Sequence, residues 1–368
     1  MARLFLSMSG EGRGHATRAR ALVQALEAGH QLTLFASGDA YAFLEPLYAG
    51  SRVRVERLPG LRFAYDARHR LRYLGTLRLV ASYLKALPAT VNRLSEMARR
   101  ERPDLVITDF EPALPRAARR CGVPFLSLDH QHFLCAYDLR VLPWRLRFHA
   151  GYMRWIVGAY YSGQAETVVS SFYFPPLRRG CRRVTQIGVL LRPEVAAATP
   201  RPGEHLVSYG RRSMTERVLE VLASSGRDVR VYGCGTRPPR GRLTFCAVSE
   251  AGFVEDLAGC CALVSTAGNQ LVGEALCLGK PVLALPEPNN FEQAINAHFL
   301  QASGAGEAVP MSSFSLVDLR RFLGRLEERR RCLDHSRLNG LPAALEVIRR
   351  HLPRPPAGAT LDEDLRVA

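Results

Sequence analysis

The chain has 368 residues, 47% of them hydrophobic and 23% charged, which allows two domains with separate cores and excludes disordered, collagen-like and disulfide-scaffold proteins. It has no run of 18 apolar residues, no apolar start long enough for a signal peptide, and nine cysteines without a CxxC pair, so we expect a cytoplasmic protein with reduced thiols and no metal. The net charge is +16, and residues 1–185 carry 28 basic and 14 acidic side chains against 22 and 20 in residues 186–368.

This uneven charge predicts that the first half of the chain meets an anionic partner. Nucleic acid, an anionic lipid surface and an acidic substrate all fit that description. The sequence has no zinc-finger spacing and no RNP-type segment, which argues against a nucleic-acid partner.

Short apolar runs typical of buried strands alternate with amphipathic helical stretches in both halves. The expected strands are Leu4–Met8, Gln31–Phe35, Asp104–Thr108, Pro124–Leu128, Thr167–Ser170, His205–Ser208, Asp228–Tyr232, Ala262–Ser265 and Pro281–Leu285. Strands that are apolar throughout are typical of parallel sheets covered on both faces. We therefore predict an α/β fold of two doubly wound Rossmann-like domains facing across a cleft.

The predicted domain boundaries follow a change in composition. An Ala- and Pro-rich stretch after Ile187 predicts a hinge, and the Pro-rich end of the chain predicts a disordered tail. The expected units are a first domain over 1–187, a hinge linker over 188–202, a second domain over 203–352 and the tail over 353–368.

A glycine-rich loop follows the first expected strand and opens a helix predicted over Ala16–Ala28. Gly10, Gly12 and Gly14 permit close approach of the backbone to a ligand, and the start of the helix favours an anion. Their spacing departs from the GxGxxG of dinucleotide-binding domains. His15, at the first helical position, is either a general base or a residue that caps the loop.

Acids and histidines follow two later strands. Asp109 and Glu111 come after Asp104–Thr108, and an Asp-His-Gln-His segment containing Asp129, His130 and His132 comes after Pro124–Leu128. Either aspartate could orient a catalytic imidazole, and polar loop residues or helix caps are the alternative. A metal held by the two later histidines would lack a third ligand at a known spacing.

A basic aromatic segment spans residues 139–161. Its aromatic side chains fall on neighbouring helical turns next to three arginines: Trp144, Phe148, Tyr152, Trp155, Arg145, Arg147 and Arg154. Such a helix could lie in a lipid headgroup layer, or it could be a core helix whose arginines reach out to solvent. The excess positive charge of this half favours membrane contact.

The second half contains the parts of a nucleotide-sugar site. Residues 266–269 offer free N–H groups at a helix start, which suit a diphosphate. Glu274 lies about one and a half turns into that helix and can accept hydrogen bonds from the vicinal diol of a ribose. Glu292 and Gln293 begin the next helix, where they suit sugar hydroxyl groups.

On these residues the sequence resembles GT-B glycosyltransferases of the MurG-like kind, over roughly residues 3–310. The pattern that carries the resemblance is Glu-Ala, Gly-Lys-Pro, Glu-Gln and Asn-Ala, together with the GxGxGH start and the Asp-His-Gln-His segment. The resemblance implies a C-terminal domain that binds a UDP-sugar and an N-terminal domain that takes the acceptor, often a lipid at the membrane.

The resemblance also implies roles for single residues. The donor site would comprise Phe253 and Val254 at uracil, Thr266, Gly268, Asn269 and Gln270 at the diphosphate, Glu274 at ribose, and Glu292 and Gln293 at the sugar. His15 would be the base, with Asp109 or Asp129 as its partner, and we place Gly12, Gly14, Glu111, His130 and His132 on the acceptor side. Thr-Ala-Gly-Asn at the phosphate loop and Ile-Gly-Val-Leu-Leu-Arg-Pro at the hinge depart from the family pattern.

The expected function is therefore inverting, metal-independent transfer of a hexose from a UDP-sugar to a hydroxyl group of a lipid-linked or other envelope acceptor. No cofactor is expected, since the UDP-sugar is a substrate. We expect the basic half to contact the inner face of the plasma membrane. A UDP-sugar 2-epimerase of the same fold and a non-catalytic protein that binds polyanions or membranes are the alternatives.

Overall fold

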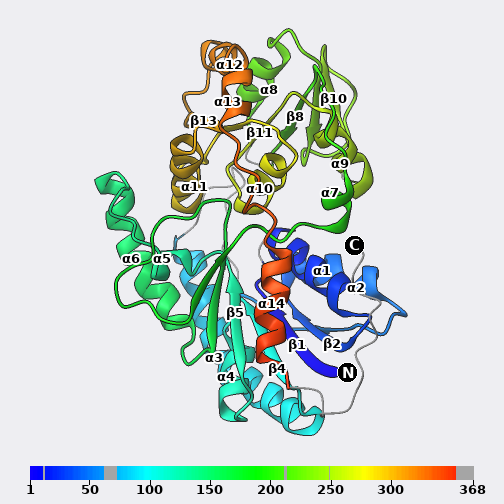
Figure 1. Ribbon diagram of the computed structural model, residues 1–368, viewed down its shortest axis with the longest axis vertical. Helices are drawn as coiled ribbons and strands as arrows, with labels where there is room; N and C mark the ends of the chain where they lie inside the picture. The colour runs from blue at the N-terminus through cyan, green and yellow to red at the C-terminus, as the bar shows by residue number, and fades with distance from the viewer. Residues whose placement is uncertain (11–12, 62–72, 211–213, 248, 354–368) are drawn as a thin grey trace.

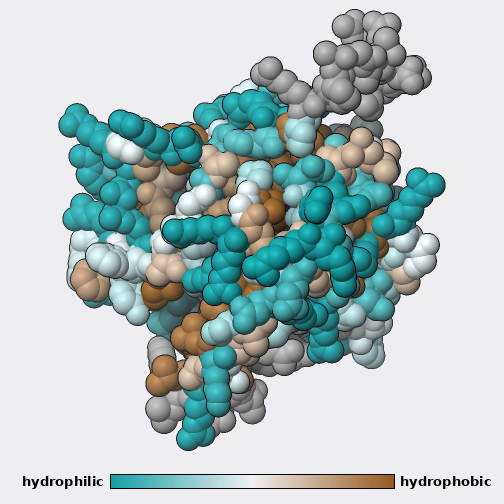
Figure 2. Space-filling model, turned by 90° about the horizontal axis from the view of Figure 1, so that it is seen from below, coloured by the Kyte–Doolittle hydropathy of each residue, from teal (hydrophilic) through white to brown (hydrophobic). Residues whose placement is uncertain are grey.

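The computed structural model describes residues 1–10, 13–61, 73–210, 214–247 and 249–353, and these form two lobes placed one above the other in Figure 1. The expected tail lies outside the described residues except for Pro353. The end of the first lobe that faces away from the second is covered mainly by hydrophilic side chains (Figure 2). No helix in the described ranges is long and apolar enough to cross a bilayer.

The first lobe is built on a parallel sheet of seven described strands in the order β3-β2-β1-β4-β5-β6-β7. These strands are β1 (Ala2–Met8), β2 (His30–Ala36), β3 (Arg54–Arg57), β4 (Leu105–Asp109), β5 (Phe125–Asp129), β6 (Glu166–Ser170) and β7 (Val184–Ile187). Both β4 and β5 are buried along their whole length, as expected for strands covered on both faces.

The second lobe repeats this plan with six described strands in the order β10-β9-β8-β11-β12-β13, again all parallel. These strands are β8 (Leu206–Tyr209), β9 (Val229–Tyr232), β10 (Leu243–Phe245), β11 (Ala262–Ser265), β12 (Val282–Ala284) and β13 (Gly306–Ala308). The strand order reverses between β1 and β4 in the first sheet and between β8 and β11 in the second. Ligands of doubly wound sheets bind at such reversals, beyond the carboxyl ends of the strands.

Helices cover both sheets (Figure 1). In the first lobe they are α1 (Arg13–Leu26), α2 (Gly38–Tyr48), α3 (Tyr73–Glu101), α4 (Ala113–Arg120), α5 (Phe133–Ala136) and α6 (Trp144–Tyr160), and α7 (Pro193–Ala197) lies in the linker. The helices that follow are α8 (Glu216–Ala223), α9 (Glu250–Gly259), α10 (Asn269–Cys277), α11 (Phe291–Ala302), α12 (Leu316–Leu323), α13 (Leu326–Arg331) and α14 (Leu341–His351). The predicted α/β architecture of two doubly wound domains is confirmed.

The chain passes between the lobes twice, and two glycines let these passages touch. A Cβ atom at Gly188 would lie 2.2 Å from the carbonyl oxygen of Arg337, and one at Gly340 would lie 2.1 Å from that of Gly188. The N–H of Gly340 donates to the carbonyl of Val189 over 2.8 Å. Any larger residue at either glycine would push the two passages apart.

The last described helix, α14, returns to the first lobe, although the sequence groups residues 203–352 as one domain. Figure 1 shows it lying along the first lobe. It contacts α1 and β7, and Ala344, Val347 and Ile348 are buried in the same apolar cluster as residues of β1 and β2. The first core is therefore completed by a segment that follows the whole second lobe.

This packing predicts that Ile348→Ala will destabilise the protein by about 2–4 kcal/mol, because it removes buried methylene groups and leaves a cavity. Glu346→Ala, on the exposed side of the same helix, should change the free energy of unfolding by less than about 0.5 kcal/mol. Urea unfolding followed by circular dichroism measures both. Equal stabilities for the two variants would show that α14 does not belong to the first core.

Candidate active site

Loops that follow strands of both sheets meet between the lobes. The backbone N–H of Phe172, after β6, donates to Oδ1 of Asn269 over 3.3 Å, and Nδ2 of Asn269 donates to the carbonyl of Ser170 over 3.1 Å. Oδ1 of Asn296, on α11, lies 3.1 Å from Nε2 of His130, after β5. The polar residues predicted from separate halves of the sequence thus line one interlobe region.

His15, Arg18 and Asp109 form a compact charged cluster at the strand reversal of the first lobe. Arg18 donates from Nε to Oδ2 of Asp109 over 3.0 Å and from Nη2 to Oδ1 over 2.9 Å. Nδ1 of His15 lies 2.9 Å from the same Oδ1. Burial alone would raise the pKa of Asp109, but the Arg18 guanidinium and the His15 ring hold that pKa below its ordinary value, so the carboxylate is ionised.

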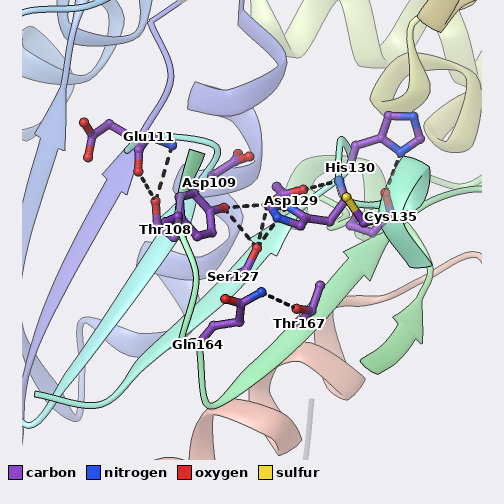
Figure 3. A network of polar contacts seen from close by, with 12 residues as sticks. Thr108, Asp109, Glu111, Ser127, Asp129, His130, Cys135, Gln164 and Thr167 are labelled. Atoms are coloured by element: carbon purple, nitrogen blue, oxygen red, sulfur yellow. Dashed lines mark hydrogen bonds and ion pairs between the residues drawn. The ribbon is translucent and has the colours of Figure 1, made fainter. Parts of the chain in front are cut away.

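This geometry decides between the two aspartates considered as partners of His15. Asp109 contacts His15, whereas Asp129 pairs with His132 at 2.7 Å. Asp129 also accepts hydrogen bonds from the hydroxyl groups of Ser127 at 2.7 Å and Tyr161 at 3.0 Å (Figure 3). It is therefore the centre of a separate buried network.

The charges of that network stabilise each other. Burial opposes the ionised form of Asp129, but His132, the backbone N–H of His132 and Ser127 together hold the pKa of Asp129 well below its ordinary value. Burial likewise lowers the pKa of His132, and the Asp129 carboxylate more than compensates, so that this pKa lies above the ordinary value. The pair is a buried ion pair whose carboxylate also accepts hydrogen bonds from the backbone N–H of His132, from Ser127 and from Tyr161.

Glu111 caps a helix and does not face the His15 cluster. Its two carboxylate oxygens accept hydrogen bonds from the N–H groups of Ala113 and Leu114, at the start of α4, over 2.7 and 2.9 Å. Figure 3 shows its side chain pointing away from that of Asp109. Burial raises the pKa of Glu111. The capping alternative describes this residue better than the acceptor-side role.

His130 contacts both lobes. Its ring nitrogens face other partners than those of His132, so the two histidines do not act together as metal ligands. Its Nδ1 lies 3.0 Å from the carbonyl of Ser170, and its Nε2 faces Asn296. Burial lowers the pKa of His130. No group of three metal-ligating side chains occurs among the residues that the structure describes.

The loop predicted to bind phosphate in the second lobe has an unusual backbone conformation. Ala267 has a φ of +63°, which is a strained conformation for a residue with a side chain. The half-buried Thr266 precedes it, and Gly268 is the N-cap of α10. A Cβ atom at Gly268 would meet nothing within 4 Å, so there is open space in front of this helix start. Strained turns of this kind turn backbone N–H groups toward an anion.

The side chains that follow this loop hold the lobes together. Asn269 contacts the first lobe as described, and Nε2 of Gln270 donates to the carbonyl of Leu190 in the linker over 2.8 Å and to Oε1 of Glu274 over 3.0 Å. The amide side chains of Asn269 and Gln270 are therefore engaged within the protein, and their role at the diphosphate stays a prediction. Gly14, at the start of α1, also faces open space, and Gly12 lies outside the described residues.

Glu274 is buried and held by an arginine of the linker. Arg192 donates to its two oxygens over 3.2 and 2.9 Å. Its Oε1 also accepts from Nε2 of Gln270, so the carboxylate is engaged by two side chains, and the role of Glu274 at ribose stays a prediction. The sequence offered no signal for this partner, because Arg192 lies 82 residues from Glu274.

The predicted sugar-binding residues begin α11. Gln293 is held by the preceding loop, where its Oε1 accepts from the N–H of Glu287 over 2.8 Å and its Nε2 donates to the Glu287 carboxylate over 3.1 Å. Glu292 is exposed, and its charge acts on Arg18 and His130 of the first lobe. Its carboxylate thus faces the interlobe region that contains the His15 cluster.

Phe253 and Val254 lie within α9, and their side chains are buried. The Phe253 ring packs edge-on against Tyr209 and Tyr232, at centroid distances of 5.6 and 4.9 Å. Its N–H donates to the carbonyl of Ser249. These contacts place α9 beside the ends of β8 and β9, and the role at uracil stays a prediction.

Comparison with known proteins connects this geometry with one family. A model of glycosyl transferase family 1 matches residues 2–327. The UDP-N-acetylglucosamine–N-acetylmuramyl-(pentapeptide) pyrophosphoryl-undecaprenol N-acetylglucosamine transferase of Methylobacterium sp. (strain 4-46) is 29% identical over 204 residues, which are 46% of this chain and 55% of that protein. The match thus spans about half the length of that relative.

Solved glycosyltransferases share the two-lobed fold. The crystal structure of Acinetobacter baumannii MurG superposes with a TM-score of 0.61 and 16% identity, over 95% of this chain and 100% of that chain. Arabidopsis thaliana UGT89C1, complexed with UDP-L-rhamnose, gives a TM-score of 0.67 and 14% identity, over 96% and 100% of the two chains. The arrangement of two facing parallel sheets is the GT-B fold, as predicted.

The buried Asp129 pair predicts a stability difference that depends on pH. Asp129→Asn should cost about 3–5 kcal/mol at pH 7, because it leaves His132 without its counter-charge. Because the native pKa of Asp129 is depressed, its contribution is complete above the unfolded-state value of about 4 and is lost as the pH falls further. The difference between wild type and variant should therefore shrink between about pH 4 and pH 2.

Urea unfolding of both proteins over this pH range measures the difference. The exposed Asp228→Asn serves as a control and should leave stability nearly unchanged. A constant difference between wild type and Asp129→Asn at all pH values would contradict the ionised pair.

Proposed function

Because the chain belongs to glycosyl transferase family 1, we propose that it transfers a hexose from a UDP-sugar to an acceptor hydroxyl group, with inversion and without a metal. The observation that carries this proposal is the 2.9 Å contact of His15 with an ionised, buried Asp109, in a region lined also by the second lobe. An imidazole held through Nδ1 by a carboxylate presents Nε2 on the opposite side of its ring. That is the arrangement of a general base.

The donor is proposed to bind against the second lobe. The start of α10 and the strained Ala267 support a diphosphate there, and Glu274 supports the ribose. The relative from Methylobacterium is named for transfer from UDP-N-acetylglucosamine, which favours UDP over other nucleotides for this chain as well. Glu292 and Gln293 begin α11 at the position proposed for the sugar.

The proposed reaction is a single displacement. Nε2 of His15 removes the proton of the acceptor hydroxyl group, whose oxygen attacks the anomeric carbon from the face opposite to UDP. The bond between that carbon and the β-phosphate oxygen breaks, and the electron pair leaves with UDP. Backbone N–H groups at the start of α10 stabilise the charge that develops on the leaving group. Asp109 stabilises the imidazolium that forms.

The acceptor is proposed to be lipid-linked, because α6 carries exposed aromatic side chains that suit contact with a membrane. Trp144, Phe148 and Trp155 are 68%, 79% and 79% exposed, and Tyr152 lies on the same helix with 61% exposure. This α6 aromatic surface belongs to a helix that projects from the first lobe (Figure 1), so the alternative of a core helix is wrong for these residues.

The charge near this surface favours an anionic bilayer. Three arginines, Arg145, Arg147 and Arg154, lie on the same helix, and the guanidinium of Arg145 lies 5.4 Å from the centre of the Trp144 ring. Exposed aromatic rings that are flanked by arginines suit the boundary between headgroups and acyl chains. We infer a peripheral contact with the inner face of the plasma membrane, where a lipid-linked acceptor would reach the first lobe.

We expect wild-type protein to bind UDP in a calorimetric titration and to bind GDP and dTDP less tightly. Glu274→Gln should weaken UDP binding, because a carboxamide accepts fewer hydrogen bonds from the ribose. His15→Gln should retain UDP binding and lose transfer by about 10²–10⁴-fold. Release of UDP from UDP-hexoses in the presence of undecaprenyl-linked or other hydroxyl acceptors measures transfer.

The exposed His335→Gln is the matched control for His15→Gln and should transfer at the wild-type rate. If the protein binds none of the three nucleotides, both the transferase and the epimerase functions are excluded. Formation of an epimerised sugar without any acceptor would instead identify a UDP-sugar 2-epimerase.

We also expect the double variant Trp144→Ser/Trp155→Ser to bind vesicles of phosphatidylglycerol and phosphatidylcholine about 10-fold more weakly or worse, because two exposed indole rings lose their burial in the bilayer. Val317→Ser, which removes a 73% exposed apolar side chain from the second lobe, should bind as wild type does. Vesicle co-sedimentation measures both. Equal binding by all three proteins would show that the α6 aromatic surface does not bind the membrane.

A further inference from the structure

Arg18 is a buried arginine to which the sequence analysis assigned no role. It follows His15 by three residues on α1, so both side chains lie on one face of the helix. The cavity beside it is lined mostly by apolar side chains, and the acid that lines it is Asp109. The guanidinium therefore has one carboxylate as its principal partner, and it grips both oxygens of that group.

The same guanidinium also reaches the imidazole ring of His15. Nη2 of Arg18, Oδ1 of Asp109 and Nδ1 of His15 form a triangle whose three sides are each 2.9 Å long. A guanidinium only donates hydrogen bonds. Nδ1 can therefore donate to Asp109 or accept from Arg18, but a single neutral tautomer cannot do both.

The two arrangements differ in what Nε2 can do. When Nδ1 carries the proton and donates to Asp109, Nε2 is unprotonated and is available as a base. When Arg18 donates to Nδ1, the neutral ring carries its proton on Nε2 and cannot accept another from a substrate there. The two-point grip of Arg18 on the carboxylate directs its N–H groups toward Asp109 and so favours the first arrangement.

Arg18 also changes the balance of charge at the ring. Its guanidinium and the Asp109 carboxylate each lie 2.9 Å from Nδ1 of His15, so the ring faces one charge of each sign. The other charged groups that act on Arg18 are Asp129 at the end of β5 and Glu292 on α11, and both lie beyond hydrogen-bonding contact with it. The opposite charges of Arg18 and Asp109 therefore nearly cancel at the His15 ring.

We propose that Arg18 is a positioning residue of this site, which holds Asp109 in place as an acceptor for Nδ1 and offsets the charge of that carboxylate at the His15 ring. Its catalytic consequence rests on the proposed function, but its effect on the imidazole ring does not. A lysine would keep the charge and lose the two-point grip. The charge and the geometry can therefore be separated by substitution.

The test follows the titration of the His15 ring in the free protein. Protein labelled with ¹⁵N-histidine is titrated by NMR, and the His15 resonances are assigned by their loss in His15→Gln. In Arg18→Gln the midpoint of the His15 titration should move to higher pH by about one unit or more, because the repelling cation is gone. Arg18→Lys should keep the wild-type midpoint. Arg99→Gln, which removes an exposed charge from α3, is the control.

A midpoint that stays or falls in Arg18→Gln would overturn the proposal. Should that variant not fold, Asp109→Asn gives the reciprocal test, because it leaves Arg18 next to the ring without its counter-charge; its midpoint must fall below that of wild type. The acidic limb of the kcat/KM profile should move with the NMR midpoint in each variant. Because the NMR result needs no substrate, the expected midpoints without any transfer activity would count against the proposed function alone.

Discussion

The site depends on one constraint, which is that every described strand in both sheets runs parallel to its neighbours. Parallel strands bring all their carboxyl ends to one edge, and each sheet reverses its strand order once. In the first lobe the reversal between β1 and β4 brings the start of α1 next to Asp109. In the second lobe α10 begins just after β11, at the reversal between β8 and β11. Helices α1 and α10 contact each other, so these two helices join the lobes.

A buried arginine lies against a buried carboxylate close to the helix start of each lobe. Arg18 pairs with Asp109 in the first lobe, and Arg192 of the linker pairs with Glu274 of the second. Buried charges are tolerated when they are paired and fully hydrogen-bonded, and in return they hold a side chain in one position. These are the carboxylates for which we propose a catalytic and a ribose-binding role, and a group held in place before a ligand arrives lowers the ordering cost of binding.

The sequence predicted the central strands and the site loops well, because buried parallel strands are apolar throughout and glycine turns mark their ends. The expected run Ala262–Ser265 matches β11 residue for residue. The edge strands β3, β7, β10 and β13 were missed: β3 has charged residues at three of its four positions, β7 has polar residues at two of its four, and β10 and β13 have only three residues each. Such short or polar edge strands are ordered by their neighbours and lack a pattern of their own.

For the site, too, the sequence predicted what has a local pattern and missed what tertiary packing decides. Residues within one loop could be grouped from the sequence, as with His15 and Gly14, but partners chosen by tertiary packing could not. Asp109 and Asp129 both end buried strands, and their order in the chain does not say which one meets His15. The separation of 91 residues between Arg18 and Asp109 likewise leaves no local signal. Asn296 was part of the recognised pattern, yet its contact with His130 appears only when both lobes are in place.

A crystal structure of the protein with UDP bound would test the central claim most directly. We expect the diphosphate at the N–H groups that begin α10, the ribose hydroxyl groups on Glu274, and the β-phosphate directed toward the His15 ring. UDP bound elsewhere, or bound between the lobes with its diphosphate away from α10, would contradict the proposed donor site.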